Sequence, residues 1–259
     1  MFGPEVEAAI AAHMLAEFPK EGCGIVTAAG FQPLPNLAED PEQGFDCALA
    51  VAELQDAGTE VLALVHSHPH RPPDLRACEG PSQADMEQQL AMGLRWGLTV
   101  TDGHATRPTL YWGPGVPLPP LEGRQFRHGP AGSDGRGDCY ALIKDYYQLE
   151  LGVELPEGPR DERWWEQKQD LYGRNFKRAG FRLIDWDEMR PHDVVLGHML
   201  SEQTNHGGIY VGNSLVLHHL PGRLSRREPI GRWRNLITHV LRHESQDRAA
   251  ILGGMPLPR

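Results

Sequence analysis

Two histidines that follow an apolar segment are the first candidates for chemistry. The run from Val61 to Val65 is apolar and typical of a buried strand, and His66 and His68 come directly after it. Because successive side chains of a β-strand alternate between its faces, these two imidazoles should project the same way, roughly 7 Å apart. One metal ion can bridge that separation. A third ligand must come from elsewhere, and Asp85 is the nearest candidate.

The same residues also have a structural explanation. A solvent-facing strand end can carry two histidines, and Ser82-x-x-Asp85 is the pattern of a capping box that starts a helix before Met86. Each half of the pattern alone is more often structural than functional. Because both halves occur in one strand–loop–helix unit, the sequence favours a metal site built from His66, His68 and Asp85.

A cysteine in the second half of the chain could act as a nucleophile. Cys139 lies where a glycine-rich loop, residues 130–138, is expected to turn into a helix. At a helix N-terminus the macrodipole and the free N–H groups favour a thiolate and lower the thiol pKa from about 8.5 toward neutrality. Cys139 would equally suit the apolar helical face that it shares with Leu142, Ile143 and Tyr146, where a small buried cysteine needs no chemistry.

Two histidines downstream could serve that nucleophile. The pattern of residues 206–219 predicts a β-hairpin that turns near Gly212. His206 and His218 lie six residues on either side of Gly212, so a tight hairpin brings them roughly opposite each other. A base and its orienting partner need that closeness. Paired surface histidines are the alternative, and the hairpin alone does not select His218 over His219.

The elements that must position these residues fall into two groups. In the first group we expect helices at 4–17, 50–56 and 83–94, and strands at 24–26, 61–65, 97–101 and 109–112. In the second we expect helices at 139–151 and 162–178, and strands at 193–199, 207–212 and 215–219. Proline and glycine dominate residues 114–129, which predicts a linker. The sequence therefore predicts domains at 1–113 and 130–245, and a C-terminal tail at 246–259.

Composition excludes several classes of function. A length of 259 residues with 40% hydrophobic residues suits about two globular domains. The net charge of −10 and the lack of a lysine or arginine run argue against nucleic acid or an anionic membrane as the main partner. No stretch is apolar enough to predict a membrane span, and the acidic N-terminus is unlike a signal peptide. The four cysteines have no C-x-x-C spacing, which disfavours a disulfide framework.

Three separated motifs resemble the signature of the JAMM metalloproteases. They are the run P-K-E-G-C-G around Glu21, the H-S-H-P core with His66 and His68, and the run S-Q-A-D from Ser82 to Asp85. The resemblance implies that His66, His68 and Asp85 bind Zn²⁺ and leave a fourth position for water. It also implies that Glu21 is the general base and that Ser82 stabilises the oxyanion. The loop between His68 and Asp85, with sixteen residues, is longer than the family's usual spacing. A longer loop closes at small entropic cost, but its effect on substrate access stays open.

The second half resembles the NlpC family of papain-like cell-wall endopeptidases. The resemblance rests on the run G-D-C at Cys139, on H-G-G-I-Y-V-G starting at His206, and on His218. It implies that Cys139 is the nucleophile and a source of an oxyanion-hole N–H, that His206 is the general base and acid, and that a polar residue orients His206. The family places that residue twelve positions after the histidine, which favours His218. The implied substrate is the peptidoglycan stem peptide, cut between D-γ-glutamate and the diamino acid.

The order of the two domains resembles the tail-tip proteins of lambda-like long-tailed phages. The resemblance implies an α+β protein with an N-terminal JAMM-type α/β/α domain and a C-terminal papain-like domain. It further implies a place at the virion tail tip, with other tail-tip proteins and stem peptides as partners. A virion can carry a wall hydrolase that lacks a signal peptide. Two other functions stay open: a structural tail-assembly protein with inactive sites, and a bacterial isopeptidase that acts on protein conjugates through the zinc site.

Overall fold

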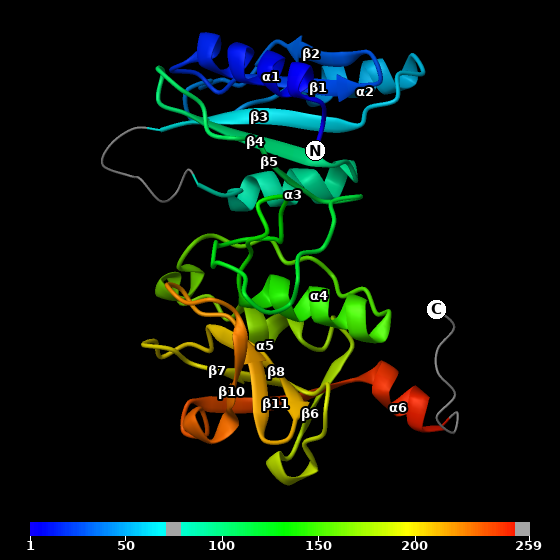
Figure 1. The fold of residues 1–259 in the computed structure, drawn as a ribbon, viewed down its shortest axis with the longest axis vertical. Helices are drawn as coiled ribbons and strands as arrows, with labels where there is room; N and C mark the ends of the chain where they lie inside the picture. Colours follow the sequence, from blue (N-terminus) through cyan, green and yellow to red (C-terminus); the bar gives the residue numbers. More distant parts are fainter. Residues whose placement is uncertain (71–78, 252–259) are drawn as a thin grey trace. The chain divides into compact units, whose positions relative to one another are not determined.

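A five-stranded mixed sheet forms the centre of the first half of the chain (Figure 1). Its strands are, in spatial order, β2 (Gly30–Leu34), β1 (Cys23–Thr27), β3 (Ala63–Pro69), β4 (Trp96–Thr101) and β5 (Leu110–Trp112). β3 runs parallel to β4, whereas it is antiparallel to β1. In this computed structural model, which describes residues 1–70 and 79–251, β3 is the central strand, so neighbours on both sides fix its backbone.

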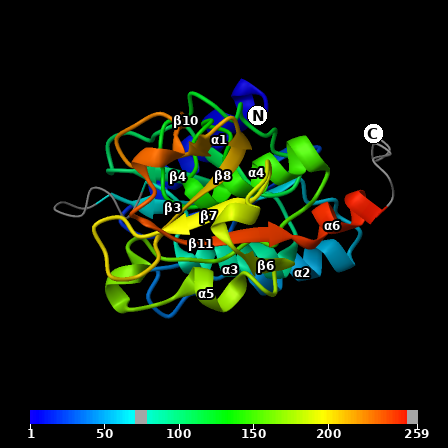
Figure 2. The ribbon, with the colours of Figure 1, turned by 90° about the horizontal axis from the view of Figure 1, so that it is seen from below.

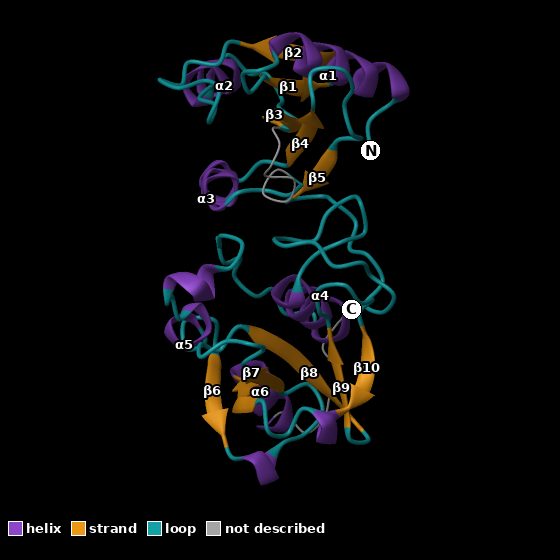
Figure 3. Cartoon of the chain, turned by 90° about the vertical axis from the view of Figure 1, so that its left-hand side faces the viewer, coloured by secondary structure: helices purple, strands orange, loops and turns teal. Residues whose placement is uncertain are grey.

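Helices cover both faces of this sheet. α1 (Pro4–Glu17) lies on one side and α2 (Ala48–Asp56) and α3 (Gln83–Met92) lie on the other, as Figure 3 shows. Each face of the sheet has its own hydrophobic core, because successive side chains of β3 point to opposite faces. Leu64 packs on the side of α2 and Val65 packs on the side of α1. The first unit therefore has the α/β/α layers that the sequence predicts.

A six-stranded antiparallel sheet forms the centre of the second half. Its strands are, in spatial order, β10 (Arg226–Pro229), β9 (Leu215–His218), β8 (His206–Gly212), β7 (Val194–Gly197), β11 (Ile237–His243) and β6 (Phe181–Ile184). Figure 2 shows β7 and β11 side by side in this sheet. α4 (Cys139–Leu151) packs on one face against Ile209 and Leu217, whereas Val195 and Val216 belong to the core of the other face.

α4 starts and stops where its sequence signals predict. The side chain of Asp138 caps the helix by accepting a hydrogen bond from the Ala141 N–H at 2.9 Å, and Gly152 ends it with a φ of 63°. Gly207 of β8 lets the helix approach the sheet, because a Cβ there would lie 2.8 Å from the Cδ1 of Ile143. Cys139 is therefore the first residue of a helix that packs closely on β8.

A tight turn and a one-residue register shift beside it together set the register of the predicted hairpin. Asn213 and Ser214 both have positive φ angles, 51° and 57°, which is the backbone of a two-residue type I′ turn. An irregularity in β8 next to that turn shifts the register by one residue, so that Gly208 pairs with His218. His206 therefore lies diagonal to His218, rather than directly opposite it as the symmetric spacing predicted.

The predicted helix at 162–178 is wrong in its extent. The chain forms the 3₁₀-helix η1 (Trp164–Gln167) and the short helix α5 (Leu171–Asn175), and Lys168 between them has a φ of 59°. A residue with that φ cannot continue a right-handed helix. Further elements were not predicted from the sequence: β2, β10 and β11, the single turns η2 (Trp186–Glu188) and η3 (Ile230–Arg232), and α6 (Glu244–Ile251).

The chain divides into two compact units. The first contains Met1–Pro117 and Gly132–Asp134, and the second contains Leu118–Ala131 and the described residues from Gly135 onward. Half of the lengthened loop between the two predicted ligand motifs, residues 71–78, lies outside the described residues, as do residues 252–259 of the predicted tail. In the part of the chain that the structure describes, each helix is too short or too polar to cross a membrane.

Candidate active site and metal centre

The three predicted metal ligands of the first unit lie together at the end of β3. The Nε2 atoms of His66 and His68 are 3.3 Å apart. Asp85 approaches both rings, with its Oδ1 3.3 Å from the Nε2 of His66 and its Oδ2 3.2 Å from the Nε2 of His68. All three donor atoms lie within 4.8 Å of one another. Two imidazole nitrogens and a carboxylate oxygen are a donor set that Zn²⁺ accepts, so these residues fit a zinc ion.

The start of α3 positions the carboxylate of this site. The Ser82 N–H donates to the Oδ2 of Asp85 at 2.7 Å, and the Asp85 N–H donates to the Oγ of Ser82 at 3.1 Å, which together form the predicted capping box. Burial raises the pKa of Asp85, but the two histidines outweigh it and hold the pKa well below its usual range. The structural and metal interpretations of Asp85 are therefore compatible, because one carboxylate can serve both.

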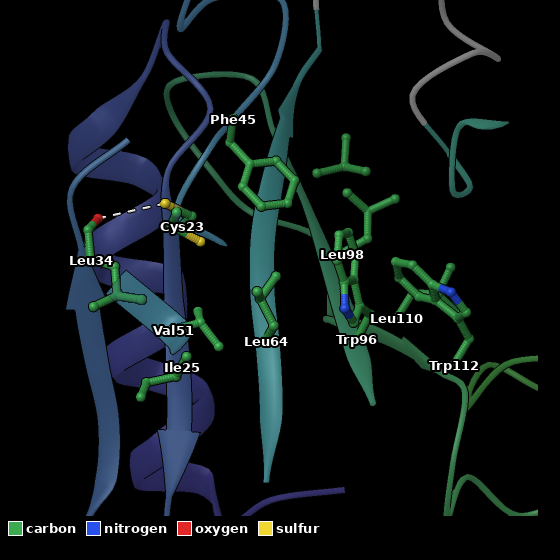
Figure 4. Close-up of a cluster of buried hydrophobic side chains, with 12 residues drawn as sticks. Cys23, Ile25, Leu34, Phe45, Val51, Leu64, Trp96, Leu98, Leu110 and Trp112 are labelled. Atoms are coloured by element: carbon green, nitrogen blue, oxygen red, sulfur yellow. Dashed lines mark hydrogen bonds between the residues drawn. The ribbon is translucent and has the colours of Figure 1, made fainter. Parts of the chain in front are cut away.

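Aromatic rings surround the buried imidazole of His66. Phe45 stacks on it with ring centroids 4.4 Å apart. Trp96 and Trp112 form edge-to-face pairs with it, with ring centroids 5.5 and 6.2 Å away. Figure 4 shows these three rings within the core of the first unit. Among the described residues, no atom forms a hydrogen bond with the Nδ1 of His66. Packing rather than a hydrogen-bonded acceptor therefore fixes the orientation of this imidazole, unlike in most metal sites.

Glu21 lies buried beside the same pair of histidines. Burial raises the pKa of its carboxyl group, while the nearby His66 and His68 act to lower it. Two hydrogen bonds hold its neighbour Gly22 against β3: the Gly22 N–H donates to the Oγ of Ser67 at 2.8 Å, and the Ser67 N–H donates to the Gly22 carbonyl at 2.9 Å. The serine between the two histidines is therefore a positioning residue that the motif analysis did not recognise.

In the second unit, the thiol of Cys139 contacts a tyrosine and the strand below it. The hydroxyl of Tyr172 lies 3.4 Å from the Sγ, and the Gly207 N–H forms a hydrogen bond that lowers the thiol pKa. Burial is nevertheless the largest influence and raises this pKa, and the Asp138 carboxylate raises it further. The lowered thiol pKa predicted from the helix N-terminus is therefore wrong, because burial and the capping carboxylate outweigh the helix.

The capping carboxylate is itself held by a buried arginine. Arg160 donates to both oxygens of Asp138, at 2.7 Å and 2.9 Å, and also to Glu157 at 3.0 Å. Although burial raises the pKa of Asp138, Arg160 outweighs this and the pKa falls to about 2. The loop before α4 is therefore fixed by a charged network, and the thiol is next to a permanent negative charge.

The two predicted histidines of the second unit are within hydrogen-bonding distance of each other. The Nε2 of His206 lies 3.3 Å from the Nδ1 of His218, and the Nε2 of His218 lies 3.2 Å from the Oε2 of Glu228. Burial, with smaller contributions from His218 and His219, lowers the pKa of His206 to about 3. At neutral pH the His206 imidazole is therefore uncharged and able to accept a proton. His219 packs instead against Phe126, with ring centroids 5.3 Å apart.

A small cavity adjoins the histidine pair. It has a volume of about 20 Å³ and is lined by His206, His218 and the apolar side chains of Val195, Val216 and Trp233. This space suffices for about one water molecule. The apolar lining belongs to the face of the sheet away from α4.

The structure does not join all three predicted members of the cysteine site by hydrogen bonds. His206 and His218 contact each other, whereas among the described residues Cys139 forms no hydrogen bond with either. The thiol instead meets β8 at Gly207, the residue next to His206. Glu228 and Tyr172 contact the two halves of this site, and both were missed because neither belongs to a motif.

Comparisons with known proteins match a different family to each of the two compact units. The prokaryotic homologs of the JAB domain match residues 4–112, and the NlpC/P60 family, which is of the cysteine peptidase class, matches residues 123–242. Among solved structures, NlpC1 from Trichomonas vaginalis is similar with a TM-score of 0.33 and 21% identity over 46% of this chain and 38% of that one.

Two curated relatives span both domains. The tail tip assembly protein K of Escherichia phage lambda is 35% identical over 203 residues, which is 78% of this chain and 90% of the phage protein. The protein of the same name from Escherichia phage N15 is 32% identical over 244 residues, 91% of this chain and 93% of that protein. With a JAB-like domain followed by an NlpC/P60 domain, and with this identity over most of both relatives, the chain belongs to the family of phage tail tip assembly proteins K.

Proposed function

We propose that the second unit is a cysteine peptidase that cleaves the amide between D-γ-glutamate and the diamino acid of peptidoglycan stem peptides. The observation that carries the proposal is the chain of contacts from His206 through His218 to Glu228. His206 is the residue before Gly207, whose backbone N–H contacts the Cys139 thiol. A neutral imidazole and a neutral thiol are the resting forms of a site in which the proton moves during attack.

The proposed reaction has two steps. The Sγ of Cys139 attacks the amide carbon while its proton passes to His206, and the Cys139 backbone N–H stabilises the oxyanion. When the C–N bond breaks, His206 returns that proton to the leaving amine and a thioester remains. Water then attacks the thioester carbon, gives its proton to His206, and releases the carboxylic acid as the thiol regains the proton.

These reaction steps require a contact between His206 and Cys139 that the free protein does not contain. The imidazole of His206 must reach the thiol of Cys139 when substrate binds, because among the described residues no hydrogen bond joins the two groups in the free protein. Tyr172 occupies the hydrogen-bonding position on the thiol at 3.4 Å. Substrate entry must therefore displace or reorient the tyrosine hydroxyl relative to the sulfur.

For the first unit we propose a zinc centre held by His66, His68 and Asp85, with Glu21 as its general base and Ser82 as oxyanion stabiliser. The clustered donor atoms and the buried Glu21 support this proposal. Zn²⁺ bound there would supply Lewis-acid chemistry for hydrolysis of an isopeptide bond. The Ser82 hydroxyl already accepts the Asp85 N–H, so an oxyanion can use only its O–H.

The family relationship supports a place for both units in a phage tail. The two curated relatives are tail tip assembly proteins, and we propose that this chain likewise acts in the virion tail tip with other tail proteins as partners. Delivery by a virion would bring the peptidase to the cell wall.

Digestion of purified stem peptides tests the proposed function. Wild-type protein should release fragments that end at D-γ-glutamate, detected by mass spectrometry, and a Cys139→Ala variant should release none. Cys47→Ala is the matched control, because Cys47 is a buried cysteine of the first unit and should leave digestion unchanged. Equal digestion by wild type and Cys139→Ala would remove the basis of the proposal.

A further inference from the structure

A buried carboxylate ends the chain of histidines in the second unit. Glu228 is only 7% exposed and lies on β10, where it pairs in register with Val216 of β9. Its Oε2 lies 3.2 Å from the Nε2 of His218. Its Oε1 contacts Arg226 and lies 3.9 Å from the Nη1 of Arg223. The two oxygens therefore have different tasks: one meets an imidazole and the other meets guanidinium groups.

The carboxylate determines where the protons of both imidazoles lie. An ionised carboxylate can only accept hydrogen bonds, so the Nε2 of His218 must carry a proton and donate it to Glu228. The Nδ1 of the neutral His218 ring is then an acceptor, and the Nε2 of His206 must donate to it across 3.3 Å. This leaves the Nδ1 of the neutral His206 ring without a proton. A lone pair at that atom is what a general base requires.

The ionised state of Glu228 follows from its contacts. Burial raises its pKa, but the hydrogen bond with His218 and the charge of Arg226 outweigh burial, and the net effect is a lowered pKa. The charged and titratable groups that face it are His218 from β9 and Arg223 and Arg226 from the chain around β10. A buried carboxylate without such partners would destabilise the fold.

We propose that Glu228 is a positioning residue of the cysteine peptidase, which fixes the tautomers of His218 and His206 and stabilises the imidazolium formed when His206 takes a proton. This inference rests on the proposed peptidase function. Nothing in the NlpC-type motif assigns the role, because the motif ends at His218. Glu228 acts through that histidine and does not touch substrate, so it should affect turnover rather than binding.

Kinetics of a charge-removing variant test the role. Glu228→Gln should lower kcat on stem peptides by about tenfold to a hundredfold, since a charge-assisted hydrogen bond is replaced by a neutral one, while KM stays within about twofold. Glu122→Gln is the matched control, because Glu122 is a half-exposed glutamate of the same unit that pairs with Arg227 at 3.1 Å. Glu228→Asp, which keeps the charge, should recover part of the lost kcat. A wild-type kcat for Glu228→Gln would overturn the proposal.

A second measurement works without substrate and without a variant. Nitrogen-15 NMR of the wild-type protein at pH 7 should show His218 protonated at Nε2 and unprotonated at Nδ1, and the same tautomer for His206. The opposite tautomer at either ring would overturn the proposal even if Glu228→Gln failed to fold. If wild-type protein digested no stem peptide but showed these tautomers, the proposed peptidase function would fail while the positioning by Glu228 stood.

Discussion

Both units use a pair of histidines on a sheet and one buried carboxylate, but they arrange the three groups differently. In the first unit the Nε2 atoms of His66 and His68 and the oxygens of Asp85 converge on one point. In the second unit the groups form a line, in which each nitrogen of His218 has its own partner. Convergent lone pairs are suited to a cation, whereas a line of donors and acceptors is suited to moving a proton.

The strands explain the difference. The first pair comes from positions two apart on one strand, so both side chains point the same way and meet at their tips. The second pair comes from two neighbouring strands, so the rings follow each other across the sheet. Residue types alone do not distinguish a metal site from a proton relay. Whether the two histidines lie on one strand or on two neighbouring strands does distinguish them.

The largest effect that would test this comparison is the loss of the nucleophile. Cys139→Ala should lower stem-peptide digestion by at least about a thousandfold, because the remaining groups of a catalytic unit retain little of its rate. The zinc content and melting temperature of the first unit should not change, since that site uses no thiol. Digestion measured by mass spectrometry beside metal analysis of the same sample checks both statements. A loss of zinc in this variant would contradict the separation of the two sites.

Next in size is the loss of the convergent site. Asp85→Asn should abolish stoichiometric zinc binding, as measured by elemental analysis of protein reloaded with zinc, while its amide oxygen can still accept the Ser82 N–H. Asp85→Ala should lose the metal and also about 1 kcal/mol of unfolding free energy, because the Ser82 N–H loses its acceptor in the capping box. Asp56→Asn, at an exposed residue at the end of α2, is the control for the charge change.

Chelation sharpens the same prediction. Removing zinc should leave stem-peptide digestion unchanged, because a thiol nucleophile needs no metal. If chelation stopped digestion, or if wild-type protein bound no zinc at all, the contrast between the two histidine pairs would be wrong.

A smaller effect distinguishes two adjacent histidines. His218→Ala should reduce kcat by about tenfold to a thousandfold, because it removes the partner of His206, whereas His219→Ala should reduce it far less. Successive strand residues face opposite sides, and His219 contacts Phe126 rather than the pair. Steady-state kinetics of both variants measure this. A larger loss for His219→Ala would mean that the orienting residue is misassigned.

The smallest expected effect is a change in the pH dependence of stability. The pKa of His206 is about 3 when folded and near its usual value of about 6.5 when unfolded, because burial disfavours its charged form. The unfolded protein therefore binds more protons, and this contribution to stability is present above about pH 6.5 and is lost as the pH falls toward 3. Melting temperatures from pH 7 to pH 4 should fall more steeply for wild type than for His206→Gln. Parallel curves would contradict the assigned pKa.

Local signals in the sequence predicted much of this molecule. The capping box at Ser82, the start of α4 at Cys139 and the hairpin that carries His218 each depend on residues that are close in sequence, and each is confirmed. Such features are determined by nearby backbone chemistry, which the sequence displays directly. The layers of the first unit were instead implied by the resemblance to a known family, and they are confirmed.

The features that were missed depend on partners that lie outside the motifs. Glu228 reaches His218 only because β10 pairs with β9, and Tyr172 reaches Cys139 only after η1 and α5 fold back on α4. The predicted direction of the shift in the Cys139 thiol pKa was wrong for a similar reason. Helix position favours a thiolate, but the burial of Cys139 and the charge fixed on Asp138 by Arg160 appear only in the folded protein.

The two-residue turn at Asn213 and Ser214, together with the register shift beside it, determines which imidazole lies beside His206. Surface turns usually tolerate inserted residues, because extra chain there adds little entropic cost. Here one added residue that propagated into β9 would exchange the faces of His218 and His219, since side chains repeat every two positions. Such an insertion would leave the sheet able to form and the composition of the site intact, yet place the wrong imidazole beside His206.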